Sequence, residues 1–331
     1  MSEEKKKRKL EERRIKEVNT SLKYLSSSAQ KKLGILAVQE QDNVFFCEDK
    51  RYKKVYTVRP AILQNKKYEL IKALCDTFHN RIRFTQVLKN SGDKIGRYMF
   101  MTVNFEAGTY YEARKEIEEF ENKIQIEITS ILHIDIQPCT LDNLLSYMVL
   151  NYSGKMQQFD IGRLFSSKET LNFGDNCKDA GNGKFILNGD NDNCGIVCVG
   201  KGYPHDMPEM TTLFEKEQAT YLVCIDFQSY DADDKEIYRL ALNSRYCNEW
   251  TELDQQNVIN MSYFLAVIKN DSEQLENMTD RIFDYYDKEQ VLLMPGVGRI
   301  QEIFLSMSSL GMKDFHSMQN TNPRIISKLF M

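Results

Sequence analysis

One run of residues in this 331-residue chain has the spacing of a phosphate-binding loop. Gly195-Ile-Val-Cys-Val-Gly-Lys-Gly202 matches G-x₄-G-K, but a loop that holds Mg²⁺ needs Ser or Thr at position 202. The intervening residues 196–199 are apolar and β-branched, which indicates a strand, and two prolines follow where a helix would have to begin. The run therefore predicts a strand. We expect no nucleotide and no cofactor here.

Other catalytic and metal-binding patterns are equally weak. Cys194 and Cys198 form the one close cysteine pair, and no second pair or histidine lies at zinc-ligand spacing, so we expect two ordinary strand cysteines and no metal. The histidines are far apart in sequence, and no G-x-S-x-G motif is present. The sequence therefore predicts no catalytic residue. The four histidines are His79, His133, His205 and His316.

Charge is distributed unevenly along the chain. The whole chain has 44 Lys and Arg against 48 Asp and Glu, which argues against a nucleic-acid binder over the whole surface. Residues 1–32 alone hold 11 basic and five acidic residues. This leader, helical or disordered, contains a candidate electrostatic tether to anionic lipid or nucleic acid. The interspersed glutamates favour the alternative of a solvated helix. The tether comprises Lys5, Lys6, Lys7, Arg8 and Lys9.

The elements expected after the leader follow a strand, helix, strand, strand, helix, strand order, typical of a split βαβ or ferredoxin-like unit. We predict this first module over 33–150. A Gly-, Asn- and Asp-rich stretch predicts a linker or loop over 151–184. The same rhythm resumes over 185–331. The fold class predicted is α+β, with two ferredoxin-like modules and a charged leader.

A nucleic-acid interface is one alternative that the strands suggest. Arginines alternate with aromatic residues on adjacent predicted strands, as on sheets that stack single-stranded bases. The ribonucleoprotein motif is not matched, and the body after residue 32 is acidic, which opposes phosphate binding. The residues concerned are Arg81, Arg83, Arg97, Phe84, Tyr98 and Phe100.

Compartment and membrane topology follow from what the sequence contains. The N-terminus is charged and has no apolar signal region, and several cysteines lie in apolar patterns, so we expect a reduced cytosolic protein. The longest apolar stretch, residues 221–225, is far shorter than the ~20 residues a membrane-spanning helix needs. Contact with a membrane would be peripheral, at its cytoplasmic face, or through partners.

Several diffuse motifs follow one another in a recognisable order, most clearly toward the C-terminus. They are Phe264–Asp271, Glu273–Leu275, Val291–Pro295, Gln301–Leu305, Thr321-Asn322, Tyr203-Pro204, and Tyr52, Lys54 and Tyr56. Over residues 35–331 the chain thereby resembles the region before the motor domain in the large transport ATPases of conjugative type IV secretion systems. In that family a strand, an Asp-x-Glu-like pair, a helix, a strand and an aromatic-containing helix lead to a Thr-Asn-like stretch.

The resemblance implies a non-catalytic role. The family's Walker motifs lie downstream of this region, so no catalytic residue carries over, and the chain is expected to be a fragment, one part of a split gene or a truncated relative. The implied role is docking to inner-membrane secretion-channel proteins, with self-association. Two alternatives stay open: a soluble nucleic-acid-binding α+β protein, and an ATPase subunit acting with a separate motor chain.

Overall fold

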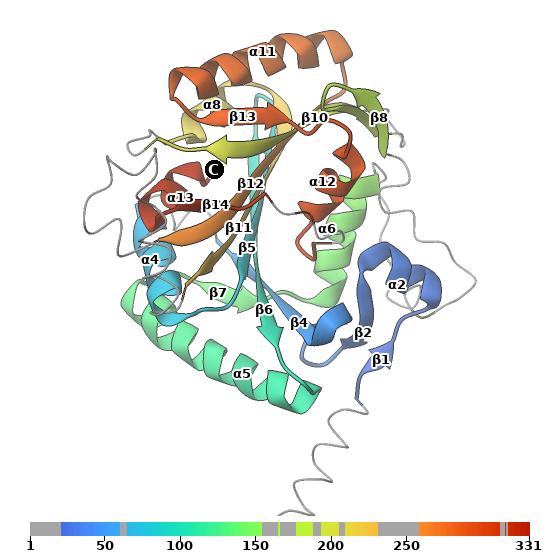
Figure 1. Ribbon diagram of the computed structural model, residues 1–331, viewed down its shortest axis with the longest axis vertical. Coiled ribbons are helices and arrows are strands. Elements are labelled where there is room, and N and C mark those ends of the chain that lie inside the picture. Colours follow the sequence, from blue (N-terminus) through green and yellow to red (C-terminus); the bar gives the residue numbers. More distant parts are fainter. Residues whose placement is uncertain are drawn as a thin grey trace, which may run out of the picture.

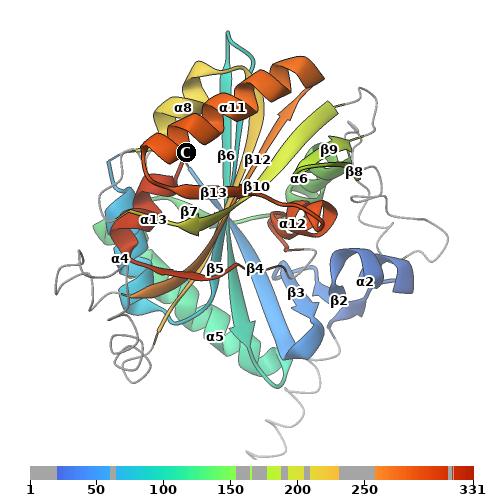
Figure 2. The ribbon, with the colours of Figure 1, turned by 45° about the horizontal axis from the view of Figure 1, so that its top comes forward.

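The protein is a mixed α/β structure built on one large antiparallel sheet (Figure 1). The computed structural model describes residues 21–59, 65–153, 165, 177–187, 193–204, 209–230, 258–311, 315 and 317–331. Within these residues the sheet holds 14 strands, and its main path runs β1-β2-β3-β4-β6-β5-β11-β12-β10-β9-β8. The strands fan out with a continuous twist (Figure 2).

In the first half of the sheet, two pairs of parallel strands each enclose a strand of the opposite direction. β4 and β5 both run antiparallel to β6, which lies between them, so they are parallel to each other and joined through α4. β6 and β7 flank β4 in the same way and are joined through α5. The elements are β4 (Arg51–Val58), α4 (Lys67–Thr77), β5 (Ile82–Asn90), β6 (Ile95–Glu106), α5 (Tyr110–Lys123) and β7 (Ile136–Pro138).

The second half repeats this connectivity. β12 lies between β10 and β11, and β10 lies between β12 and β13, so the strand order is again fourth, first, third, second. The elements are β10 (Asn193–Gly202), α8 (Thr211–Lys216), β11 (Ala219–Ser229), β12 (Ile259–Lys269), α11 (Ser272–Lys288) and β13 (Leu292–Pro295).

Each half also begins with a hairpin and continues into a helix at the equivalent point. The second strand of each hairpin pairs with the start of the first long strand, β3 with β4 and β9 with β10. The hairpins are β2 (Ile35–Gln39) with β3 (Val44–Cys47), and β8 (Cys177–Gly181) with β9 (Lys184–Leu187). The helices that follow β7 and β13 are α6 (Leu141–Ser153) and α12 (Ile300–Ser306).

The two halves meet at a seam between β5 and β11. These strands occupy the same place in each half and pair antiparallel, from Ile82 opposite Phe227 to Asn90 opposite Ala219. The register therefore has a local twofold axis, and the seam makes one continuous sheet from two similar halves.

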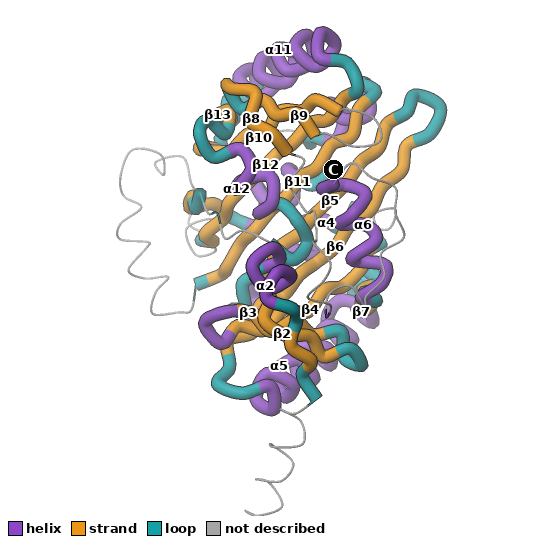
Figure 3. The backbone as a smooth tube through the Cα atoms, turned by 90° about the vertical axis from the view of Figure 1, so that its right-hand side faces the viewer, coloured by secondary structure: helices purple, strands orange, loops and turns teal. Residues whose placement is uncertain are grey.

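Helices cover both faces of this sheet and create two hydrophobic cores. Ile225 and Val223 on β11 belong to the first core, whereas their neighbours Cys224 and Leu222 belong to the second, as expected for strand alternation. The first core is covered by α4, α5, α8, α11 and α13 (Pro323–Leu329). The second is covered by α2 (Ser27–Leu33), α6 and α12, which Figure 3 shows in front of the strands.

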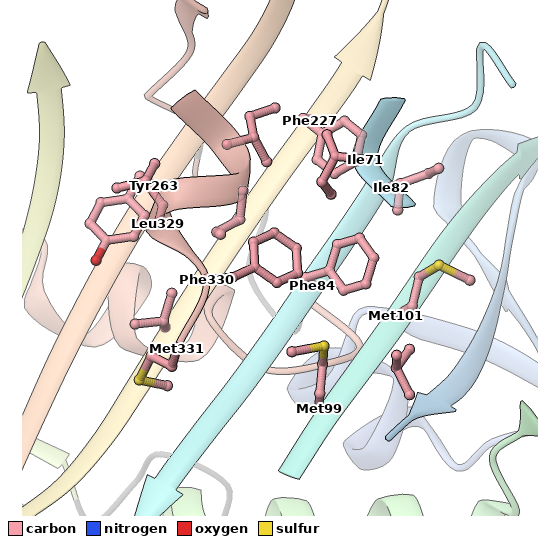
Figure 4. Close-up of a cluster of buried hydrophobic side chains, with 14 of the residues drawn as sticks. Ile71, Ile82, Phe84, Met99, Met101, Phe227, Tyr263, Leu329, Phe330 and Met331 are labelled. Carbon is pink, nitrogen blue, oxygen red and sulfur yellow. The ribbon is translucent and has the colours of Figure 1, made fainter. Parts of the chain in front are cut away.

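The last residues of the chain pack into the first core beside the seam. α13 contacts α4, and Phe330 lies with its ring centroid 4.9 Å from that of Phe84 on β5 (Figure 4). The Met331 N–H donates to Gln86 Oε1 at 2.8 Å, and Lys67 Nζ donates to the Phe330 carbonyl at 3.0 Å. A segment of the second half is thus bound to a strand and a helix of the first.

Several helix ends form as their sequences predict. Thr109 and Glu112 form a capping box at α5, and Asp271 accepts from the Gln274 N–H at the start of α11. Beyond Lys123, however, the chain continues as a π-helix over Ile124–Ile131 instead of the uniform α-helix expected there. Three β-branched residues at alternating positions in that stretch fit an α-helix poorly.

Two predicted boundaries differ from the structure. Within the stretch predicted as a linker, Cys177–Gly181 forms β8, because Asn182 and Gly183 both have positive φ and close a tight hairpin onto β9. The predicted leader overlaps the folded body, since residues 21–33 include β1 (Lys23–Tyr24) and α2, and Ala29 and Leu33 are buried. The sequence also predicts a helix over 231–242, a range that lies outside the described residues.

Candidate basic pocket

A shallow pocket, with room for about one water molecule, opens on the sheet face that carries the second core. It lies over β4, β5 and β6, beside the segment that follows α12. Among the described residues, its lining contains four cationic side chains and no acidic one. We call it the basic pocket; it is lined by Arg51, Lys53, Arg81, Arg83, Thr102, Asn104, Ser309 and Leu310.

Two of these arginines are held by one fully buried carboxylate. Asp226 on β11 stands directly opposite Arg83 across the seam, and Arg83 Nη2 donates to its Oδ2 at 2.7 Å. Arg81 donates from Nε to Oδ1 at 2.8 Å and from Nη2 to Oδ2 at 2.5 Å. Burial alone would raise the pKa of the Asp226 carboxyl, but the Arg83 and Arg81 guanidiniums outweigh it and hold that pKa below its ordinary value.

The segment after α12 presents a run of carbonyl groups to the same face. Lys53 Nζ donates to the Leu310 carbonyl at 2.7 Å, and Arg83 Nη1 donates to the Ser306 carbonyl at 2.7 Å. Carbonyls between them accept from threonine hydroxyls: Met307 from Thr85 at 3.3 Å and Ser309 from Thr102 at 2.6 Å. Cations and hydroxyls thus satisfy carbonyls at and beyond the C-terminal end of α12, where the helix dipole is negative.

These bonds explain why α12 is shorter than its sequence predicts. The apolar spacing predicts a helix from Ile300 to Leu310, but the α-helix ends at Ser306. Beyond Ser306 the chain follows the polar side chains of β4, β5 and β6 that bond its carbonyl groups. It then reaches Gly311, whose φ is +59°. A Cβ at Gly311 would lie 1.9 Å from Arg83 Nη1, so glycine is required there for a close approach as well as for its φ.

One polar group at the pocket has no hydrogen-bond partner. Ser309 is fully buried, and its Oγ makes no hydrogen bond within the described part of the chain, although its carbonyl accepts from Thr102. Leaving a buried hydroxyl unsatisfied is unfavourable, so this position costs some stability in the arrangement described.

The residues of the phosphate-loop-like run lie in the interior of the sheet. Gly195–Gly202 lies within β10, confirming the strand prediction, and the β10 backbone pairs with β9, β12 and β13. A Cβ at Gly195 would meet the Phe185 ring at 2.4 Å, and one at Gly200 would meet Tyr203 Oη at 2.3 Å. These glycines therefore make room for aromatic rings.

The remaining residues considered for chemistry are dispersed. Cys198 is buried on β10, which raises the pKa of its thiol, and the half-buried Cys194 donates to the Lys269 carbonyl at 3.3 Å. Across the described ranges, no group of three or more His, Cys, Asp or Glu side chains could hold a metal ion. His79 Nδ1 lies 3.4 Å from Ser229 Oγ. His205, His316 and the tether residues Lys5–Lys9 lie outside the described residues.

The aromatic and basic residues proposed for base stacking do not form one surface. Phe84 is buried in the first core and Phe100 in the second, so the two rings point to opposite faces of the sheet. Arg97 pairs with Glu215, away from Arg81 and Arg83 in the basic pocket. Tyr98 is half exposed. The alternation predicted the strands correctly but not a shared binding face.

Sequence reasoning missed the basic pocket because its residues come from four separate segments. One signal was available: Asp226 interrupts the apolar strand Tyr221–Phe227, and a charge in such a strand is buried only when paired. The partners on β5 could not be identified from the sequence.

No described helix combines the length and apolar character that crossing a membrane requires.

Comparisons with known proteins add nothing to this geometry. A scan against protein-family models and a search of curated proteins found no match to this chain.

Proposed function

We propose that this protein is a non-catalytic interaction module, similar to the pre-motor region of the transport ATPases of conjugative type IV secretion systems. It would dock on inner-membrane channel subunits at the cytoplasmic face and self-associate. In this proposal its two halves are tandem ferredoxin-like modules, each made of two split βαβ units and fused edge to edge at the β5–β11 seam.

The strand connectivity supports the modular part of the proposal. Both halves place their strands in the same order, and each is preceded by a hairpin at the same position. Two independent domains are more often joined by a flexible linker and meet only through contacts between side chains. Here the seam and the packing of α13 against α4 join them into one scaffold.

The element order around the motifs supports the proposal. Asp271 caps α11, which lies between β12 and β13 in the chain. Thr321 ends β14 (Gln319–Thr321), and Asn322 caps α13 by accepting from the Ile325 N–H at 3.0 Å. The chain thus runs strand, capped helix, strand, helix and Thr-Asn stretch, which is the order that the resemblance implies.

The observation that carries the docking role is an apolar edge within this same stretch. β13 pairs with β10 alone among the described strands, so its other edge is open. Leu292, Met294 and Val297 are 56%, 47% and 65% exposed, respectively. Large apolar side chains on a strand with an open edge are typical of a surface that another protein covers. We call Leu292 and Met294 on β13, together with Val297 just after it, the β13 edge.

Co-purification tests this role directly. The purified chain is mixed with inner-membrane subunits of a conjugative secretion channel, and a Leu292→Lys/Met294→Lys variant is compared with Ile131→Lys. Ile131 is 61% exposed on the π-helix and serves as the matched control. We expect the β13-edge variant to lose channel-subunit binding and self-association, measured by light scattering, while the control keeps both. Equal binding by all three proteins would contradict the proposal.

ATP turnover separates the remaining alternative classes. The chain alone should hydrolyse no ATP above a buffer control, and a separate motor chain, where one partners it, would restore turnover. Sustained turnover by the chain alone would overturn the non-catalytic role. Nucleic-acid binding is the less supported alternative, because the two central rings, Phe84 and Phe100, are buried on opposite sheet faces.

A further inference from the structure

We propose that the β13 edge pairs with the β13 edge of a second copy of this chain, so that two sheets join across a twofold axis. The inference rests on the self-association in the proposed function and gives it a geometry. It starts from the open side of β13, which pairs with β10 alone among the described strands. Leu292 and Met294 are exposed on this strand, and Val297 follows it.

The first half of the chain contains the same edge in a polar form. β7 occupies the place of β13, and each of the two strands ends in a proline. In each half the residue after this proline donates its N–H to the first long strand at 2.8 Å. Counting back from the proline, Gln137 corresponds to Met294. In the same way, Asp135 corresponds to Leu292.

The polar form shows that this position does not require apolar side chains. Gln137 Nε2 donates to Asp135 Oδ1 at 2.6 Å, and Arg59 pairs with the same carboxylate at 3.2 Å. The backbone pairing of β7 with β4 is thus compatible with a polar, solvated edge. Large apolar side chains at the equivalent place on β13 are therefore not needed for the fold, and they are typical of an edge that a partner covers.

Charge also distinguishes the β13 edge from the ends of the main strand path. The end strands β1 and β8 carry Lys23 and Lys178, and such charges oppose pairing with a further strand. Residues 291–298 contain no charged side chain. Residues 287–290 before them hold two acidic residues and one basic residue, and Arg299 follows them. An antiparallel pair of copies places the acidic flank of one beside the basic flank of the other.

The backbone of β13 is self-complementary about Leu293. The Gly296 N–H donates to the Val197 carbonyl of β10 at 2.8 Å. Since backbone groups alternate in direction along a strand, those of Leu293 point to the open side. Two antiparallel copies centred on Leu293 can exchange both hydrogen bonds there. The same register places Leu292 of each copy opposite Met294 of the other, at a non-hydrogen-bonded site, where side chains come closest.

The donors beside Leu293 favour a second copy over a long partner strand. Pro295 has no N–H, and the Val291 N–H already donates to the Tyr286 carbonyl at 2.9 Å. Leu293 is therefore the one outward donor of β13, and a longer strand would find no further N–H to accept from. A second copy offers the same single donor and acceptor at the matching place.

Sedimentation equilibrium of the purified full chain tests the pairing. Leu292→Asp/Met294→Gln gives β13 the side chains of β7, which this fold already carries at an equivalent edge, so the variant should fold. The matched control is Ile95→Asp, at an apolar residue that is 45% exposed on β6. We expect wild type and control to dimerise, and the dissociation constant of the edge variant to rise at least about tenfold. A monomeric wild type, or an edge variant as dimeric as wild type, would overturn the proposal.

Cysteine cross-linking tests the register. Leu292→Cys and an affinity-tagged Met294→Cys are mixed, oxidised mildly and separated on a non-reducing gel, with wild type as the control for the native cysteines. We expect the mixed dimer to form in preference to either homodimer, because positions 292 and 294 of the two copies face each other. Cross-linking that does not favour the mixed dimer would overturn this arrangement.

Channel-subunit binding separates this inference from the proposed function. One edge strand takes one neighbour at a time, so a subunit docked at the β13 edge would compete with the second copy. A monomeric wild type whose edge variant still loses channel-subunit binding would overturn the second copy and leave the docking role intact. A dimer that dissociates in the edge variant while channel-subunit binding is unchanged would support the inference and contradict docking at this edge.

Discussion

Arg83 and Asp226 are 143 residues apart in the chain and stand directly opposite each other across the β5–β11 seam, with Nη2 2.7 Å from Oδ2. The contact joins the two halves of the sheet at a fully buried carboxylate. Arg81 and the carbonyl groups after α12 complete the arrangement.

Asp226→Asn should strongly destabilise the protein. Asparagine keeps the shape but removes the negative charge, so two guanidiniums lose their buried counter-charge, and the free energy of unfolding should fall by about 3–5 kcal/mol. Urea unfolding followed by circular dichroism measures this. The matched control is Glu215→Gln, which removes the partner of Arg97 in a partly exposed pair and should cost less than about 1 kcal/mol. Equal losses in the two variants would contradict a special role for the buried pair.

The same pair makes the protein sensitive to acid in a defined direction. The folded pKa of Asp226 lies below the unfolded value of about 3.9, so its stabilisation is complete above that pH and declines as the pH falls toward the folded pKa. The stability difference between wild type and Asp226→Asn should therefore narrow by about 1 kcal/mol between pH 6 and pH 3. Urea titrations across this range measure it. A difference that stays constant would show that the carboxylate is not the titrating group.

Gly311→Ala and Gly298→Ala form a matched pair, because both residues have positive φ. At Gly298 no atom lies within 4 Å of the position that an alanine Cβ would occupy. Alanine there should lower the free energy of unfolding by only the cost of a positive φ, about 1 kcal/mol. At Gly311 the new Cβ would also displace the Arg83 guanidinium, and the loss should exceed about 2 kcal/mol. Thermal unfolding distinguishes them. Similar losses would mean that the segment after α12 moves aside without cost.

Phe330→Ala should uncouple α13 from the first half. The ring is fully buried against Phe84, and removing a buried aromatic ring typically costs about 3–5 kcal/mol. Arg324→Ala, at an exposed position on the same helix, should change stability by less than about 0.5 kcal/mol. The Met331 amide donates a hydrogen bond to Gln86. Hydrogen exchange would show whether this amide loses protection when the Phe330 ring is removed. Retained protection in Phe330→Ala would contradict the coupling.

Most of the long elements could be predicted from the sequence because their signals are local. Asp271 followed by apolar residues at helical spacing predicts α11, and apolar runs predict β11 and β12. The hairpin β8–β9 was missed because its Gly-Asn-Gly turn is also what a loop contains. α13 has seven residues and a proline at its start, which is too short a pattern for periodicity to identify.

The basic pocket could not be predicted because its geometry depends on non-local pairing. Arg83 alternates with apolar residues on β5 as a surface residue would, and only the pairing of β5 with β11 brings Asp226 opposite it. Ser309 lies in a stretch that continues the apolar pattern of α12 and predicts helix. Ser309 lines the pocket because side chains of β4, β5 and β6 donate hydrogen bonds to the carbonyl groups from Ser306 onward.

The symmetric register of the seam also has a consequence for its side chains. An antiparallel pair of strands that occupy equivalent places has the form of an isologous contact, in which every interaction would occur twice. Across the local axis from Arg83 and Asp226, however, stand Thr220 and Lys89. The seam is therefore symmetric in its backbone pairing and asymmetric in its side chains, with the buried Arg83–Asp226 pair at one end of it.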